Sequence, residues 1–314
     1  MLKSYIYVHA FQKNERGEKM EKEGNEMKHR KRDEGAWWIA LLLVGVMIAG
    51  SVGAYMVLYG NTNGEKKILT ISGSTTVQPI ASKAAEKFMD AHPNVDIRVS
   101  GGGSSVGVTS VGSGNVDIGM ASRDLKSSEK AQYPTLLPTT IAKDGIAVIV
   151  HPSNSISNLS LEQIRGIYNG TYKNWKQLGG DDKEIVVYGR DSTSGTREFF
   201  WEHVMKKENF TVTLHELNSN GAVKTAVSQN DGAIGYVGLG YIDTSVKALK
   251  IDNEGQQVEA NVANVLNGKY PISRSLYFIT RGTPEGLAKE FIDYVLSPEG
   301  QKIVEDEGFV PLRK

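Results

Sequence analysis

Residues Ile68–Pro79 read ILTISGSTTVQP, and this stretch decides the fold. The apolar run Ile68–Ser72 predicts a strand, and Val77–Ala91 predicts a helix with apolar residues three and four positions apart. The turn Gly73-Ser74-Thr75-Thr76 joins them. Because the start of a helix carries unpaired N–H groups and partial positive charge, this turn is predicted to bind an oxyanion.

Two further segments repeat this arrangement. Gly101-Gly102-Gly103-Ser104-Ser105 follows a predicted strand at 95–99, and Arg190-Asp191-Ser192-Thr193-Ser194-Gly195-Thr196 follows one at 185–188. Ordinary helix capping explains any one of them equally well. Arg190 offers a planar fork for two oxyanion oxygens, although a surface salt bridge with Asp191 is the alternative. Together the three segments predict one small, multiply charged anion held from several sides.

Strand and helix patterns alternate along the rest of the chain after a polar linker at 60–65. Further strands are predicted at 116–120, 145–150, 233–237 and 275–280, and further helices at 104–113, 161–168, 195–207, 221–229, 284–296 and 298–307. This alternation predicts an α/β fold with largely parallel sheets, in which ligands bind beyond the carboxyl ends of the strands.

The N-terminal part of the chain differs from the rest. Residues 36–59 carry no charge over 24 positions, and Lys28-His29-Arg30-Lys31-Arg32 precedes them. About 20 apolar residues span a bilayer. The basic cluster therefore predicts a single transmembrane anchor at 36–59, a cytoplasmic tail at 1–35 and residues 60–314 outside. A signal peptide cleaved near Ala54 is the alternative, and Met27 is a plausible true start.

Composition and motifs exclude several classes of function. The 314 residues contain 36 basic and 36 acidic side chains, so bulk charge does not indicate nucleic-acid binding, and the lack of cysteine excludes thiol catalysis. No nucleotide-binding P-loop is found, Val106 stands where a G-x-G-x-x-G fingerprint needs glycine, and no nucleophile elbow is present. The histidines have no metal spacing. We therefore expect a binding protein with no enzyme activity, no metal and no cofactor.

The motifs, in their order, resemble those of the phosphate-binding proteins of high-affinity phosphate ABC transporters. The resemblance covers about 68–314 and rests on five stretches: Ser72–Pro79, Gly102–Gly107, Val116–Arg123, Gly189–Arg197 and Gly232–Val237. It implies a two-lobed, type II periplasmic-binding-protein-like fold with two chain crossovers. Lobe 1 would comprise 66–143 and 246–314, and lobe 2 would comprise 144–245. It also implies permease and ATPase subunits as partners.

The resemblance further implies which residues hold inorganic phosphate. They are Ser74, Thr75, Thr76, Ser104, Ser105, Ser122, Arg123, Asp124, Arg190, Ser194, Gly195 and Thr196. Some members of the family accept the phosphate proton with a carboxylate directly after an Ala-Ser step, where this chain has Arg123-Asp124. The acceptor is therefore left open among Ser122, Asp124 and Asp117, and Asp124 is equally well explained as a cap or as a partner of Arg123.

Three other functions compete with phosphate delivery. The first is a receptor for sulfate, molybdate or tungstate, which carry no proton. The second is a tethered sensor or adhesion module, and the third is a phosphoester hydrolase, for which no base or metal cluster is evident.

Overall fold

The computed structural model describes Met47 and residues 66–253 and 255–312. The chain divides into two units, Met1–Gly64 and Glu65–Lys314, and all described residues except Met47 belong to the second. The predicted tail at 1–35, linker at 60–65 and anchor at 36–59 lie outside the described residues, apart from Met47. Among the described residues, no helix is both long and apolar enough to cross a membrane.

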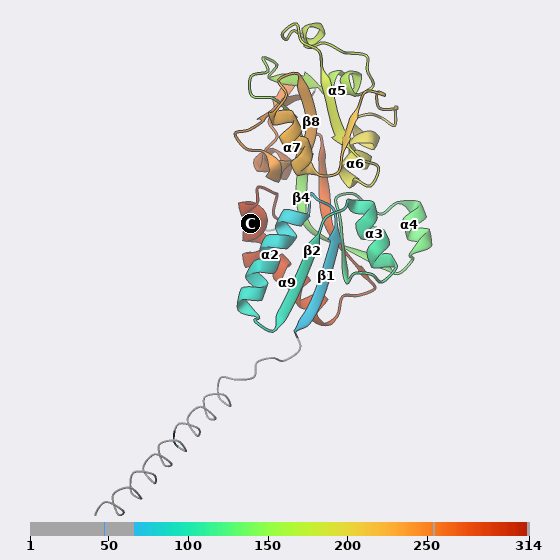
Figure 1. The fold of residues 1–314 in the computed structure, drawn as a ribbon, viewed down its shortest axis with the longest axis vertical. Helices are drawn as coiled ribbons and strands as arrows, with labels where there is room; N and C mark the ends of the chain where they lie inside the picture. Colours follow the sequence, from blue (N-terminus) through green and yellow to red (C-terminus); the bar gives the residue numbers. More distant parts are fainter. Residues whose placement is uncertain (1–46, 48–65, 254, 313–314) are drawn as a thin grey trace, which may run out of the picture. The chain divides into compact units, whose positions relative to one another are not determined.

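Lobe 1 is a sheet with helices on both faces (Figure 1). β1 runs parallel to β2 and β3, and β12 joins antiparallel to β3 and β4. Helices α2, α9 and α10 pack on one face around Phe88 and Phe291, whereas α3 packs on the other through Val108 and Val111. The elements are β1 (Lys67–Gly73), α2 (Gln78–Ala91), β2 (Val95–Ser100), α3 (Ser104–Gly112), β3 (Ile118–Ala121), α4 (Ser127–Gln132), β4 (Leu136–Val150), β12 (Ser273–Arg281), α9 (Gly286–Leu296) and α10 (Pro298–Asp306).

Lobe 2 repeats the layered plan around the second half of β4. β8 pairs antiparallel to β4 and parallel to β6, and β6 runs parallel to β7. Trp175 and Phe200 belong to the core on one face, and α7 packs on the other through Val223 and Val227. The elements are β5 (Asn158–Ser160), α5 (Leu161–Tyr168), η1 (Trp175–Leu178), β6 (Val186–Arg190), α6 (Gly195–His203), β7 (His215–Leu217), α7 (Asn220–Ser228), β8 (Ala233–Gly238), η2 (Leu239–Tyr241), β9 (Lys247–Ala248), β10 (Lys250–Asn253), β11 (Gln256–Val258) and α8 (Val262–Leu266).

The long strand β4 carries the chain from one lobe to the other. Its residues 136–145 pair with β12, and its residues 146–150 pair with β8. Farther along the chain, Ile251, Tyr270 and Ile272 belong to the same core cluster as Ile146 and Val148 of lobe 2. We therefore propose that the return crossing lies later than the predicted residue 246, and that lobe 1 resumes near Ser273.

Candidate functional site

The first predicted segment lies at the carboxyl end of β1. Gly73 has φ +137°, and a Cβ there would come within 2.3 Å of Met120 O, so only glycine fits this close approach. The next three side chains, Ser74, Thr75 and Thr76, are buried. The Thr76 N–H donates to Ser74 Oγ (3.2 Å), which fixes the turn that opens α2. The segment thus places three buried polar residues at the end of a parallel strand, as predicted.

The second segment contributes one buried hydroxyl. Ser104 at the start of α3 is fully buried, and its Oγ accepts the Ser122 N–H (3.0 Å) and lies 3.4 Å from Ser122 Oγ. Ser105 is only half-buried, and its Oγ accepts from Arg123 Nη2 (3.1 Å). The structure therefore brings Ser104 and Ser122 together and directs Ser105 toward Arg123.

The third segment connects β6 to α6. Ser194 is the N-cap of α6, where its Oγ accepts the Arg197 N–H (3.2 Å). Arg190 is 1% exposed and donates from Nε to Leu217 O (3.1 Å) and from Nη2 to Asn218 O (3.0 Å). Asp191 instead accepts from the backbone and hydroxyl of Thr193. The surface salt bridge between Arg190 and Asp191, the alternative considered from the sequence, is therefore not what the structure shows.

The three segments meet where the two lobes touch. Thr76 Oγ1 of lobe 1 lies 3.1 Å from Thr196 Oγ1 of lobe 2. The Ser105 N–H donates to Thr193 O (3.1 Å), and a Cβ on Gly195 would lie 2.1 Å from Ser104 Oγ. Such close contacts between lobes describe a closed cleft lined by buried polar groups.

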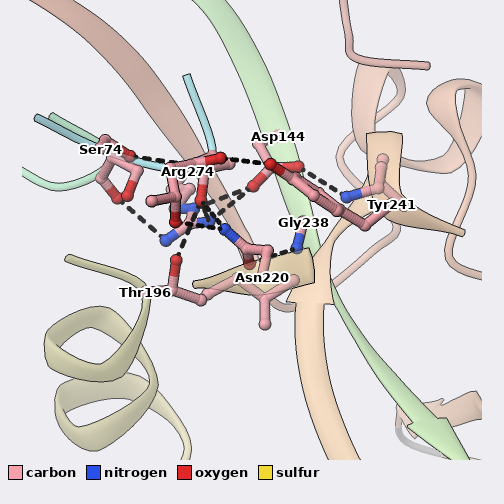
Figure 2. A network of polar contacts seen from close by, with 12 residues as sticks. Ser74, Asp144, Thr196, Asn220, Gly238, Tyr241 and Arg274 are labelled. Carbon is pink, nitrogen blue, oxygen red and sulfur yellow. Dashed lines mark hydrogen bonds and ion pairs between the residues drawn. The ribbon is translucent and has the colours of Figure 1, made fainter. Parts of the chain in front are cut away.

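Three residues that the sequence analysis did not select also belong to this cluster: Asp144 on β4, Asn220 at the start of α7, and Arg274 on β12. Arg274 donates from Nε (3.1 Å) and Nη2 (2.7 Å) to Asp144 Oδ2, and both side chains are buried. Arg274 Nη2 also lies 3.3 Å from Thr76 Oγ1, and Asn220 Nδ2 donates to the same oxygen (3.0 Å). Figure 2 shows Arg274 and Asn220 converging with Thr196 on this point.

These residues did carry weak signals in the sequence. Asp144 stands next to an apolar strand, and Arg274 stands next to another, so two opposite charges border predicted buried strands. Asn220 follows β7 and begins a helix, which is the arrangement of the three selected segments. The strand β7 is only 3 residues long and was not predicted, so this fourth instance was missed.

Among the buried arginines of the described residues, Arg190 is the only one without a carboxylate partner. Arg123 forms a two-bond ion pair with Glu129 (2.6 and 2.8 Å), and Arg274 pairs with Asp144. Burial lowers the pKa of Arg190, and the nearby charge of Asp191 offsets this only in part. Arg190 is therefore a buried guanidinium that is held by two backbone carbonyls and has no ion-pair partner among the described residues.

Two of the proposed proton acceptors lie outside the buried cluster. Asp124 is exposed, and its Oδ1 accepts from the Tyr277 hydroxyl (2.6 Å). Asp117 is exposed as well, and its Oδ2 accepts from the backbone and hydroxyl of Thr70. Arg123 points toward Glu129 and the Asp124 carbonyl. Of the acceptors considered, only Ser122 is buried beside the other hydroxyls.

The described residues contain no group of His, Asp and Glu side chains that could hold a metal ion. The site consists of hydroxyls, amides, the Asp144–Arg274 ion pair and the guanidinium of Arg190, so donors and positive charge outweigh the single carboxylate, as suits an oxyanion.

Comparison with known proteins agrees with this geometry. Residues 60–299 match the PBP superfamily domain. The phosphate-binding protein PstS of Bacillus subtilis is 38% identical over 257 residues, covering 80% of this chain and 84% of that protein. A crystal structure from Clostridium perfringens, described as a putative phosphate ABC transporter substrate-binding protein with bound phosphate, is 42% identical. It has a TM-score of 0.74 and covers 79% of this chain and 100% of that one.

A second solved structure, an ABC-type phosphate transport receptor from Vibrio cholerae, is 34% identical, with a TM-score of 0.64 and coverage of 78% and 100%. Both the two-lobed architecture and the sequence similarity extend over nearly all of the described residues. The chain belongs to the PstS family of phosphate-binding proteins, within the PBP superfamily.

Proposed function

We propose that this protein is an extracytoplasmic receptor that binds inorganic phosphate between its lobes and delivers it to an ABC-type phosphate importer. The observation that carries the proposal is the guanidinium of Arg190, which is 1% exposed and has no ion-pair partner among the described residues. Burying a charge without an ion-pair partner is costly, and a bound anion would supply that partner. The relatives named above, which are phosphate-binding proteins, support phosphate as that anion.

Binding of phosphate would follow from donors converging on a site shielded from water. We propose that the ligands are Ser74, Thr75, Ser104, Ser122, Arg190, Ser194, Gly195 and Thr196. The Thr76 hydroxyl, shared by Asn220, Arg274 and Thr196, would support this set from behind. Charge-assisted hydrogen bonds contribute about 1.5–3 kcal/mol each. Several of them, after the costs of desolvation and closure, support binding at about 1 μM or tighter, which corresponds to about −8 kcal/mol.

Delivery would depend on closure of the lobes. Because neither lobe alone surrounds the anion, phosphate should stabilise the closed arrangement by the contacts that it makes to both. Lys126 of lobe 1 and Glu198 of lobe 2 form an ion pair (2.8 Å) across the cleft in this closed form. The permease and ATPase subunits would then recognise the closed receptor.

Attachment to the membrane is part of the proposal. It rests on the uncharged span 36–59 and the basic residues before it. The protein should remain with membranes after washing at high salt, and external protease should reach residues 60–314. Recovery of a soluble form that begins near Ala54 would instead show cleavage.

Calorimetry with phosphate, sulfate and molybdate tests the choice of anion. We expect strong preference for phosphate, because the buried Ser122 hydroxyl can accept a hydrogen bond from the O–H group of phosphate, which sulfate lacks. Equal affinity for sulfate would refute the assignment to phosphate and favour a general oxyanion receptor. Hydrolysis of a phosphoester by the purified protein would contradict its assignment as a receptor without enzyme activity.

A further inference from the structure

Asn220 joins the lobes at the centre of the polar cluster. It is fully buried at the start of α7 in lobe 2. Its Nδ2 donates to Thr75 Oγ1 (3.1 Å) and to Thr76 Oγ1 (3.0 Å), both in lobe 1. One amide group therefore uses both of its hydrogens on two neighbouring hydroxyls of the opposite lobe.

The orientation of this amide follows from its other side. Asn220 Oδ1 accepts from the Gly238 N–H (3.4 Å). If the amide were turned over, Nδ2 would face that N–H group, and two donors would oppose each other. Only the orientation with Nδ2 toward Thr75 and Thr76 satisfies all of these groups.

Counting hydrogens then fixes the direction of the Thr76 hydroxyl. A hydroxyl has one hydrogen and accepts at most two hydrogen bonds. Thr76 Oγ1 receives one bond from Asn220 Nδ2 and one from Arg274 Nη2 (3.3 Å), so both acceptor positions are filled. The remaining neighbour of this hydroxyl in the described part of the chain is Thr196 Oγ1 at 3.1 Å. Thr76 must therefore donate its hydrogen to Thr196.

The same count leaves Thr196 as a donor. Its Oγ1 accepts from Thr76 and has no other hydrogen-bond partner among residues 66–253 and 255–312. Its own hydrogen is therefore free to point at a ligand. Figure 2 shows this sequence of contacts from Asn220 and Arg274 to Thr196.

We infer that Asn220 is a positioning residue that, together with Arg274, makes Thr196 a hydrogen-bond donor toward the bound anion. The inference rests on the proposed phosphate site. A hydroxyl held as a donor faces a bare oxygen favourably and a protonated oxygen unfavourably. Asn220 should thus favour the phosphate dianion over the monoanion, which carries one more proton.

The test compares phosphate affinity at pH 6 and pH 8 by calorimetry in the wild type and in Asn220→Ala. Without the amide, the Thr76 hydroxyl is free to accept and Thr196 is no longer held as a donor. We expect phosphate affinity to fall about tenfold or more at pH 8, and by a factor at least threefold smaller at pH 6. The ratio of the affinity at pH 8 to the affinity at pH 6 should therefore be smaller in Asn220→Ala than in the wild type.

The other charged or titratable groups around this point are Asp144, Arg190, Tyr236, Tyr241 and Arg274, from β4, β6, β8, η2 and β12. Burial raises the pKa of Tyr236 to about 12. Tyr241 donates to Thr75 O, and burial raises its pKa to about 12, far from the range tested. Asp144 forms an ion pair with Arg274, and the bonds of Asn220 in the described residues go to Thr75, Thr76 and Gly238 instead. Because these groups are present in wild type and variant alike, they do not account for a difference in the ratio.

Asn154→Ala is the matched control. Asn154 is another buried asparagine of lobe 2, and its Oδ1 accepts the Ile156 N–H (2.9 Å) without a bond to the cleft residues. It should bind phosphate like the wild type at both pH values. If Asn220→Ala does not fold, the same measurement is made on Thr76→Val. This substitution removes the hydroxyl that lies between Asn220 and Thr196, with little change of shape.

Each outcome has a separate meaning. An equal loss of affinity at pH 6 and pH 8 would overturn the inference, because it would show that Asn220 only holds the lobes together. Unchanged affinity in Asn220→Ala, or in Thr76→Val if that variant decides, would overturn it as well. If the wild type itself fails to bind phosphate, the proposed function fails, and that result is independent of the variants.

Discussion

A methyl group added at Gly195 should disfavour closure of the lobes while leaving each lobe intact. A Cβ there would lie 2.1 Å from Ser104 Oγ and 3.0 Å from Ser122 Oγ. Ser104 is fully buried, and its Oγ is held by the Ser122 N–H, so it has little room to turn away. Overpacking of this kind costs about 1–3 kcal/mol. Since about 1.4 kcal/mol is a factor of ten, phosphate should bind Gly195→Ala about 5- to 150-fold more weakly.

Gly221→Ala provides the matched control for this prediction. Gly221 also lies in the first turn of a helix, and a Cβ there would meet no atom within 4 Å. Both substitutions change helix propensity in the same direction. Calorimetry with phosphate should separate them, whereas the melting temperature of the ligand-free protein should change little in either. If Gly195→Ala binds phosphate as well as Gly221→Ala does, the contact between Gly195 and Ser104 is not part of the bound state.

Three further predictions concern single charged residues. Arg190→Lys should weaken phosphate binding about tenfold or more, because lysine lacks the planar fork, and unchanged calorimetric affinity would place Arg190 outside the site. Asp124→Asn should leave the preference for phosphate over sulfate unchanged, since Asp124 is exposed and bonded to Tyr277; altered selectivity would contradict this. Although burial raises the pKa of Glu129, bonds from Arg123 and the Lys126 N–H lower it on balance, below its ordinary 4.5. Ionised Glu129 thus stabilises the folded state above about pH 4.5, and this contribution is lost at lower pH. The difference in melting temperature between wild type and Glu129→Gln should therefore shrink on acidification.

Patterns local in the sequence were the most predictable part of this protein. The helix predicted at 161–168 is α5 (Leu161–Tyr168), and the helix predicted at 298–307 is α10 (Pro298–Asp306). The glycine-hydroxyl turns were identifiable for the same reason, because a strand, a turn and a helix lie within about a dozen residues. In contrast, the strand predicted at 145–150 is only the last part of β4 (Leu136–Val150). The first part was not predicted because it contains polar residues, which pair with β12.

The missed residues depend on contacts between distant parts of the chain. Asp144 and Arg274 are direct cross-strand partners on β4 and β12, yet they are 130 positions apart in sequence. Nothing local to either residue indicates that the other will neutralise it. The acceptor role considered for Asp124 stays a prediction, and it was drawn from local sequence alone. Its neighbours in sequence suggested a ligand, but the chain turns its carboxylate toward Tyr277.

The position of the Asp144–Arg274 pair links the site to the crossing between the lobes. Asp144 lies on β4 immediately before the residues that leave β12 and pair with β8, from Ile146 onward. Its Oδ1 accepts the Leu239 N–H (2.9 Å) of lobe 2, while its Oδ2 holds Arg274 of lobe 1. Arg274 in turn contacts Thr76 in the first glycine-hydroxyl segment. A buried ion pair is expensive unless every partner is in place. The pair therefore favours one arrangement of the strands that cross between the lobes. Because Arg274 also contacts Thr76, this arrangement fixes where Thr76 contacts the opposite lobe.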